Sequence, residues 1–246
     1  MPNNNFPKAM KHGDLEEISP NVFFVTGSCS IRRPLPMKFS RNMTVVREGN
    51  ELTLINTVRL NDAGLEQLDA LGQVKHVIRI AGFHGMDDPF YKDRYGAKVW
   101  SVDAVYNSSF EPDPKPEDIY LEADVVLSGE TILPISSARI VAINSSVPKE
   151  ALLLLERDGG ILISGDCLQS WSETDQYFSF IGKKMMKKAG FIKAHNVGPA
   201  WLKFAKPDKT EMKNILNVEF QNLLPAHGKP VVGSAKDRYR EVLLNL

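Results

Sequence analysis

Cysteine is scarce in this chain, and neither sign of charge is in excess. The 246 residues include two cysteines, Cys29 and Cys167, which lie far apart and outside any paired metal-ligand spacing. We therefore expect reduced thiols in an intracellular, cytoplasmic protein. Lysine and arginine together number 30, as do aspartate and glutamate, so the net charge is zero. A dedicated nucleic-acid surface normally needs a basic excess, so this balance argues against a nucleic-acid partner.

The chain also lacks a long apolar run and an apolar leader. No run approaches membrane-spanning length, and residues 1–6 show no charged-then-apolar signal pattern, so we expect no membrane partner. Residues 1–15 are largely polar and predict a poorly ordered N-terminal extension. With 43% hydrophobic and 24% charged residues, the composition is that of a globular protein, and the length suits a single domain over residues 1–246.

Strand and helix signals alternate along the chain, which predicts an α/β protein with a buried sheet. Helices are expected after a cap at Asn61 or Asp62, over residues 176–189, after Asp208, and after a capping box at Ser234 and Asp237. Loops are expected at 28–40 and between residues 80 and 98, and a crossover at 106–118. Strands are expected at 22–25, 42–46, 51–56, 74–80, 98–102, 125–133, 139–143, 151–155 and 161–163.

Chemically active side chains follow three of the apolar strands. The strand at 74–80 leads into Gly82-Phe83-His84-Gly85-Met86-Asp87-Asp88, and the strand at 161–163 leads into Gly165-Asp166. Near the C-terminus, Leu223-Leu224 leads into Pro225-Ala226-His227-Gly228. Loops that follow strands commonly carry binding and catalytic groups. We therefore expect the fold to bring these three strand ends together.

The order of these signals resembles that of the metallo-β-lactamase-fold hydrolases over most of the chain. The first metal loop of that family reads H-x-H-x-D-H, and His84 and Asp88 stand at its first and fifth positions. Asp166 resembles the family's bridging aspartate, and His227 resembles its last histidine. The resemblance implies an α/β fold of the four-layer αββα type, in which two mixed sheets are covered by outer helices.

Several positions depart from the family's ligand pattern. Met86 and Pro89 stand where the second and third histidines of the first loop belong, and Ser146 takes the place of another histidine. Asn56 replaces the acid that normally ends the strand before the first helix. A metal centre wants three or more imidazole or carboxylate ligands and an open position. A normal two-metal centre is therefore not supported, and the resemblance implies a degenerate one.

The donors that remain by this resemblance are His84, Asp88, Asp166 and His227. They would hold at most one divalent ion, of zinc, iron or manganese. In that case Asp88 and Asp166 are the candidate catalytic residues, because they would hold the metal and its water and Asp88 would also accept a proton. The competing interpretation is a metal-free polar network, or a site rebuilt for another ligand.

Two functions remain open at this point. One is a mononuclear metal-dependent hydrolase of a small ester, thioester or amide. The other is a catalytically inactive binding or regulatory module that keeps the fold and the cleft without metal. Both imply a small-molecule ligand in the cleft, and the sequence indicates no oligomeric state. Some relatives of this fold process RNA, but the neutral charge and the missing ligands disfavour that function.

Three further features have alternative interpretations. Cys167 would serve as a soft ligand or a nucleophile, but a small buried hydrophobe is favoured. His195 would enter the cleft as a substitute ligand or acid, although a lone loop histidine is more often solvated. The lysine-rich segment 183–193 would attract an anionic surface, but its lysines are typical of a solvated helix face.

Overall fold

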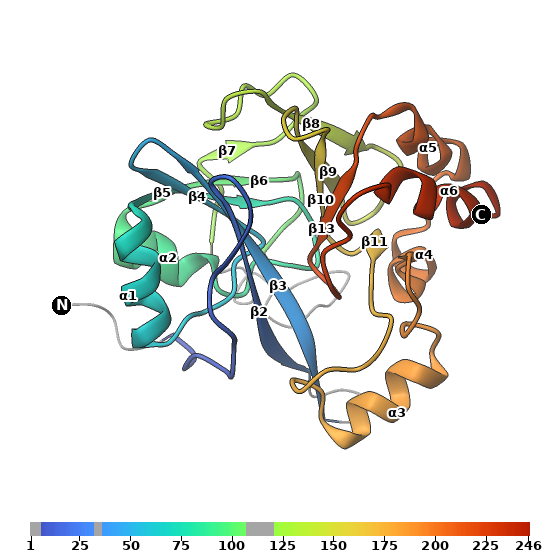
Figure 1. Cartoon of the computed structure of the whole chain (residues 1–246), viewed down its shortest axis with the longest axis horizontal. Helices are drawn as coiled ribbons and strands as arrows, with labels where there is room; N and C mark the ends of the chain where they lie inside the picture. Colours follow the sequence, from blue (N-terminus) through green and yellow to red (C-terminus); the bar gives the residue numbers. More distant parts are fainter. Residues whose placement is uncertain (1–5, 32–35, 107–120) are drawn as a thin grey trace.

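Two mixed β-sheets form the centre of the molecule (Figure 1), which is described here from a computed structural model covering residues 6–31, 36–106 and 121–246. The first sheet contains, in spatial order, β1 (Glu16–Ser19), β2 (Val22–Ile31), β3 (Met37–Glu48), β4 (Glu51–Ile55), β5 (Gln73–Arg79), β6 (Lys98–Ser101) and β7 (Val125–Val126). The second contains β13 (Asn222–Pro225), β10 (Ile161–Ser164), β9 (Glu150–Leu155) and β8 (Ala138–Ile143). A short antiparallel pair joins β11 (Leu168–Gln169) to β12 (Asn196–Val197).

Both large sheets mix parallel and antiparallel pairs. In the first sheet, β1 to β4 pair antiparallel, whereas β4, β5, β6 and β7 pair parallel. In the second sheet, β8, β9 and β10 pair antiparallel, whereas β10 and β13 pair parallel. The parallel pairing of β10 with β13 matters most for the site, because the carboxyl ends of these two strands lie side by side.

Helices cover the outer faces of the sheets. The helices α1 (Asp62–Leu71) and α2 (Asp88–Tyr95) share an apolar cluster with the first sheet. The helices α4 (Pro199–Ala205), α5 (Lys209–Asn214) and α6 (Ala235–Leu244), with a 3₁₀ turn at Ile215–Asn217, share another with the second sheet. A third cluster contains residues of both sheets and lies between them. The architecture is therefore the expected αββα sandwich of mixed sheets.

Strand β9 shows why the sequence folds into these layers. Leu152 and Leu154 belong to the cluster under the outer helices, whereas Leu153 and Leu155 belong to the cluster between the sheets. Successive side chains of a strand point to opposite faces, so a strand covered on both faces must be apolar throughout. The run 151–155 meets this requirement, and all five of its residues are buried.

Several elements differ from the sequence expectations. The expected loop at 28–40 is wrong within the described residues, because β2 and β3 continue their pairing as far as Ile31 and Met37. Helix α2 was not expected; it has Pro89 in its first turn, and the left-handed Gly96 (φ 64°) ends it. The capping box at Ser234 is also wrong, since Ser234 has a φ of 55° and makes no side-chain cap.

At the ends of elements, two expected helix caps are confirmed and two expected ranges are too long. Asn61 caps α1, its side chain accepting a hydrogen bond from the Gly64 amide, and Asp208 caps α5 in the same way. The strand expected at 125–133 is reduced to β7, and helix α3 runs over Phe180–Lys188 instead of 176–189. The expected crossover at 106–118 lies outside the described residues except for Tyr106.

The N-terminal segment from residue 6 packs against the first sheet and its helices. The ring of Phe6 meets that of Phe90 edge-on at 5.9 Å, and His12 Nε2 accepts a hydrogen bond from the Asn61 amide at 2.9 Å. The sequence predicted a poorly ordered extension over residues 1–15; within the described part of it, these contacts tie residues 6 and 12 to the first sheet's helices and to the segment before α1. Among the helices of the described ranges, none combines the length and the apolar character needed to cross a bilayer.

The layer between the sheets should dominate the stability of this fold. Leu153 is fully buried there, so we expect Leu153→Ala to lower the free energy of unfolding by ~2–5 kcal/mol, through lost burial and a cavity. Leu244→Ala is the matched control, because Leu244 is 51% exposed at the end of α6 and should change stability by less than about 0.5 kcal/mol. Chemical denaturation measures both, and equal effects would contradict this account.

Candidate metal site

Three strand ends bring His84, Asp166 and His227 together. Ser164 of β10 pairs with Pro225 of β13 in parallel register, so the segments that follow, with Asp166 and His227, leave the sheet at the same edge. His84 lies beyond β5 of the other sheet. Its loop is joined to the start of β9 by hydrogen bonds from the Gly82 amide to the Lys149 carbonyl (2.9 Å) and from the Ala151 amide to the Ile80 carbonyl (2.8 Å). The group therefore lies where the two sheets meet.

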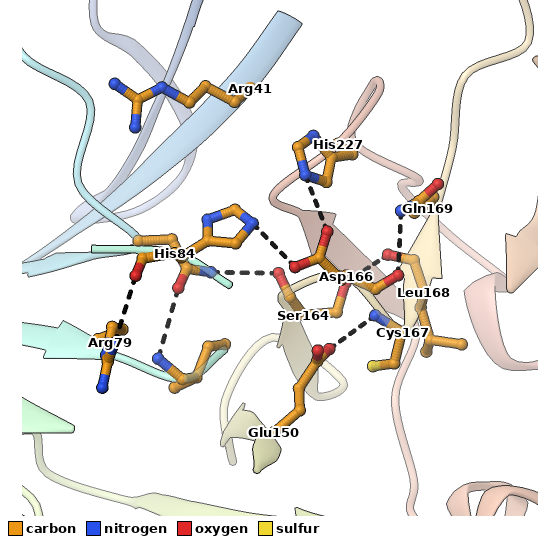
Figure 2. A network of polar contacts seen from close by, with 12 residues as sticks. Arg41, Arg79, His84, Glu150, Ser164, Asp166, Cys167, Leu168, Gln169 and His227 are labelled. Carbon is orange, nitrogen blue, oxygen red and sulfur yellow. Dashed lines mark hydrogen bonds and ion pairs between the residues drawn. The ribbon is translucent and has the colours of Figure 1, made fainter. Parts of the chain in front are cut away.

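The carboxylate of Asp166 lies between the two imidazoles (Figure 2). Its Oδ2 is 3.2 Å from His84 Nε2, and its Oδ1 is 3.1 Å from His227 Nε2. The side chains are 15%, 8% and 7% exposed for Asp166, His84 and His227, respectively. Each residue offers a ligand atom, and these atoms lie within 4.8 Å of one another. We refer to these three residues as the His84–Asp166–His227 cluster.

The backbone carbonyl of Ser40 fixes the proton position on His227. Its oxygen lies 3.2 Å from His227 Nδ1, and because a carbonyl can only accept, Nδ1 carries the hydrogen. In a neutral ring, Nε2 then has its lone pair directed at Asp166. An outer hydrogen bond of this kind orients the histidine ligands of many metal sites.

Asn42 of β3 holds the loop that carries His227. Its side-chain amide donates to the carbonyls of Pro225 (2.8 Å) and Gly228 (2.7 Å), and its backbone amide donates to the Ala226 carbonyl (2.8 Å). Gly228 has a φ of 100°, and a Cβ there would lie 2.1 Å from the Ser170 backbone, so only glycine fits. The position of His227 is therefore set by contacts with β3 and with the segment after β11.

The environment of Asp166 favours a charged carboxylate. Burial raises the pKa of this group, but the nearby charges of His84 and His227 outweigh it and hold the pKa well below its ordinary value. Apart from the 3.2 Å ion-pair contact with His84 Nε2, Oδ2 has no hydrogen-bond partner among the described residues. A buried carboxylate oxygen without a donor is costly, and such an atom calls for an explanation.

A single divalent ion fits this cluster. Two imidazoles and one carboxylate are the protein ligands of several catalytic zinc and iron sites, which keep an open position for water or substrate. The ligand atoms of the three residues lie within 4.8 Å of one another, close enough for one ion to contact all three, and the 3.1 and 3.2 Å distances end on different oxygens of Asp166. An ion would also give the unpartnered Oδ2 a partner.

Asp88 is not brought into the cluster. It is fully buried at the start of α2, where Oδ1 accepts from the Thr57 hydroxyl and Oδ2 from the Tyr106 hydroxyl, both at 2.5 Å. Burial raises the pKa of Asp88 above its ordinary value, although these hydrogen bonds act against the shift. Helix α2 begins at this residue, and its side chain lies with Thr57 and Tyr106. The structure thus brings together three of the four expected metal ligands, namely His84, Asp166 and His227.

The substituted family positions make structural contacts. Ser146 is buried, donates to the Ile143 carbonyl and accepts from the Glu150 amide, both at 3.0 Å. Asn56 lies between the sheets' strand ends, because its side chain donates to the Ser164 carbonyl at 3.3 Å and accepts from the Ile80 amide at 3.4 Å. Ser146 and Asn56 therefore stabilise the backbone around the cluster.

The other two residues with alternative interpretations lie apart from the cluster's ligand atoms. Cys167 is fully buried, and burial raises the pKa of its thiol well above the ordinary value, in keeping with a small buried hydrophobe. The ring of His195 meets that of Tyr239 edge-on at 5.5 Å, and His195 is not among the described residues that line the cavity around the cluster.

The cluster lines a cavity of about 1030 Å³. Arg41, Gln169 and Trp201 also line it, and sequence reasoning did not select them as site residues. Arg41, on β3, is buried and forms an ion pair with Asp87 in the loop before α2. No local pattern marks these residues, because each reaches the cavity through long-range packing.

Glu150 is a buried acid next to the cluster (Figure 2). Its Oε1 accepts a hydrogen bond from the Cys167 amide at 2.6 Å, whereas Oε2 has no partner among the described residues. Burial, and then the charge of Asp166, raise the pKa of Glu150 well above its ordinary value. The folded protein therefore favours the protonated form of this side chain.

Known proteins resemble this chain in structure but not in sequence. No protein-family model matches it, and no curated protein does. Among solved structures, VMB-1 is 16% identical with a TM-score of 0.61, covering 97% of this chain and 98% of its own. The DIM-1 metallo-β-lactamase is 13% identical with a TM-score of 0.61, covering 96% and 99%. The FIM-1 metallo-β-lactamase from Pseudomonas aeruginosa, in its mono-zinc form, is 13% identical with a TM-score of 0.60, covering 97% of each chain.

At these identities the likeness shows the fold alone. The match over nearly the full length of each chain, together with the two mixed sheets and their outer helices, shows that the protein has the metallo-β-lactamase fold. The resemblance seen in the sequence is thereby confirmed at the level of the fold.

Asn42→Ala tests the contacts that position His227. It removes two buried hydrogen bonds to backbone carbonyls, so we expect a loss of ~1–3 kcal/mol in the free energy of unfolding. Chemical denaturation measures the loss, and the NMR signals of the His227 ring should shift at the same time. Asn245→Ala, in the C-cap of α6, is the control. An unchanged His227 signal in Asn42→Ala would contradict the positioning role.

Glu150→Gln tests the raised pKa of the buried acid. A carboxyl whose pKa is higher in the folded state contributes stability below its unfolded pKa of about 4.3, and this contribution is lost as the pH rises. The substituted amide stays neutral, so the stability of the variant relative to the parent protein should increase as the pH rises above about 4.3. Glu66→Gln, on the exposed face of α1, should show no such trend. Denaturation at several pH values measures the difference, and a flat or falling curve for Glu150→Gln contradicts the assignment.

Proposed function

We propose that the protein is a mononuclear metal-dependent hydrolase of a small ester, thioester or amide. The observation that carries the proposal is the convergence of His84, Asp166 and His227 in one cavity, with a buried carboxylate oxygen that lacks a hydrogen-bond partner among the described residues. The metallo-β-lactamase fold is consistent with it, although a fold alone does not determine function.

The residues of the cluster have separate roles in this proposal. A bound divalent ion supplies a water of lowered pKa, which is a nucleophile near neutral pH. His84, His227 and one oxygen of Asp166 would hold the ion, and the Ser40 carbonyl keeps the His227 ring in the required tautomer. The oxygen of Asp166 that did not contact the ion would be the candidate to accept a proton from the water.

Asp88 has no ligand role in this proposal. Thr57 and Tyr106 already donate to both of its oxygens, in a buried network separate from the cluster. Its contribution would be to hold the start of α2, and with it the loop that carries His84. The proposal therefore keeps Asp166 as a catalytic residue and assigns Asp88 a positioning role.

A catalytically inactive binding module is the second candidate. The distances of 3.1 and 3.2 Å are also those of direct contacts between protonated imidazoles and a carboxylate, which need no metal. Met86 and Ser146 stand where the fold family has further histidines, which reduces the ligand set. In this case the cavity binds a small molecule and catalyses no reaction on it.

The metal content of protein purified without chelator or metal-affinity resin separates the two candidates. We expect close to one equivalent of zinc, iron or manganese by elemental analysis, because functional sites hold their metal tightly. Less than about a tenth of an equivalent would exclude the hydrolase and leave the binding module. Hydrolysis of an aryl ester should be lost on chelation and return when the metal is restored.

Two variants identify the ligands. Asp166→Ala should lose the metal, whereas Asp88→Asn should retain it, since the structure separates Asp88 from the cluster. Circular dichroism and thermal unfolding verify that both variants are folded. Retention of metal by folded Asp166→Ala would show that the cluster is not the metal site, and its loss from folded Asp88→Asn would show that Asp88 is a ligand.

A further inference from the structure

The cavity around the cluster is larger than a small polar substrate requires. Its volume of about 1030 Å³ lies at the upper end of the ~300–1,000 Å³ that pockets for drug-sized ligands enclose. The cluster needs only a carbonyl group and a water next to it. The rest of the cavity must therefore accommodate another part of the ligand, and its walls indicate what that part is.

The walls beyond the cluster are mostly apolar, and three segments contribute many of their residues. The β2–β3 ribbon contributes Met37 and Phe39, helix α3 contributes Met186, and helix α4 contributes Trp201. Met37, Met186 and Trp201 are at most 9% exposed, so these side chains pack against the protein interior on the side away from the cavity. By contrast, Phe204, which also lines the cavity, is 63% exposed. An exposed aromatic ring at a cavity with apolar walls favours the entry of an apolar group.

Methionine is concentrated in these walls. Four of the eight methionines of the chain line the cavity, namely Met37, Met86, Met185 and Met186. Methionine side chains are unbranched and adapt their shape, which suits a ligand that is itself flexible. An unbranched alkyl chain fits such walls better than a rigid ring system does.

The charge of the walls favours a neutral ligand. Arg41 is the one lysine or arginine among the described residues that line the cavity, and its charge is already balanced by the buried carboxylate of Asp87. Along the walls away from the cluster, an anionic group would thus meet no uncompensated lysine or arginine. Burying a charge without a partner is strongly unfavourable, so a neutral ester, thioester or amide is preferred to a free acid.

Besides Arg41 Nε and Asp166 Oδ2, two buried polar atoms of cavity-lining residues lack hydrogen-bond partners among the described residues. They are the indole Nε1 of Trp201, which is a donor, and Oε1 of Gln169, which is an acceptor. The Gln169 side chain is fixed by its other atom, because Nε2 donates to the Asp166 carbonyl at 3.0 Å. Unpaired buried groups of this kind are rare, and a ligand with a carbonyl group would give the indole an acceptor.

We propose that the cavity binds a neutral molecule with an unbranched alkyl chain of medium length, placed against the methionine-rich walls with its carbonyl group toward the cluster. The substrate class of the hydrolase is then an acyl ester, thioester or amide with such a chain. The hydrolytic part rests on the function proposed above, whereas the binding part depends only on the walls.

Binding of methyl ketones with six-, eight- and ten-carbon chains tests this inference. These molecules are neutral, carry a carbonyl and cannot be hydrolysed. Trp171 and Trp201 line the cavity and Trp100 does not, so intrinsic fluorescence reports occupancy. Affinity should increase about two- to fourfold with each added methylene, as expected for burial of an alkyl chain. Absence of binding, no dependence on chain length, or tighter binding of an aryl methyl ketone or the fatty acid of equal carbon number would overturn the proposal.

Two pairs of variants locate the binding site. Ala189→Trp places a large ring in the cavity and should weaken binding of the ten-carbon ketone at least about tenfold, whereas Ala63→Trp, on the exposed face of α1, should not. Phe204→Asp replaces an exposed lining residue and should also weaken binding, whereas Phe180→Asp, 76% exposed on α3 outside the lining, should not. Equal effects within both pairs would overturn the assignment to this cavity.

The Asp166→Ala protein separates this inference from the proposed function. If the walls bind the chain, this variant should retain the dependence of affinity on chain length even though it lacks the metal. Loss of that dependence in the folded variant would overturn the binding proposal. A protein that binds the ketones but contains no metal would instead leave the binding proposal intact and exclude the hydrolase.

Discussion

The apolar layer between the two sheets is the constraint on which the site depends. Ile78 of β5, Leu153 of β9 and Ile163 of β10 belong to the same buried cluster, so the two sheets are held in contact near the ends of β5 and β10. The hydrogen bonds between the His84 loop and the start of β9 then fix the first sheet against the second. His84 meets Asp166 and His227 only because this layer determines how the sheets face each other.

The His84–Asp166–His227 cluster places a partly buried carboxylate, whose burial is unfavourable, close to two imidazoles that can carry positive charge. A partly buried carboxylate beside two imidazoles is stable if the rings carry protons or if a cation lies between the three groups. The Ser40 carbonyl accepts the proton of His227 Nδ1, so the other nitrogen carries a second proton only when the ring is positively charged. Metal binding and ring protonation therefore compete for the same nitrogen lone pairs, and metal affinity should fall as the pH decreases.

Local patterns in the sequence predicted an α/β protein and the meeting of three strand ends, whereas the resemblance to the metallo-β-lactamase-fold hydrolases implied the layers of the fold. Apolar runs such as 151–155 indicated strands covered on both faces, and residues after such strands must lie at the edge of a sheet. Asp88 was placed in the site by its spacing from His84, but the turn into α2 directs its side chain toward Thr57 and Tyr106. Spacing along the chain cannot report the direction of a side chain at the start of a helix.

The contacts of Asn42 were likewise hidden from sequence reasoning, because they join residues more than 180 positions apart. The same holds for the cavity walls formed by α3 and α4. Residues 28–40 contain prolines and arginines, and this composition suggested a loop where cross-strand pairing extends β2 and β3. Tertiary pairing overrides local preference in such ribbons.

The location of the cavity walls has an evolutionary consequence. Met186 of α3 belongs to a small apolar cluster with Trp171 and Phe178, which is distinct from the large cluster between the sheets. Substitutions in α3 thus change the shape of the cavity while the layer that stabilises the fold keeps its packing, and their effects on unfolding and on ligand choice should be close to additive. A scaffold divided in this way can acquire new ligand preferences by drift in one peripheral helix, without first gaining surplus stability.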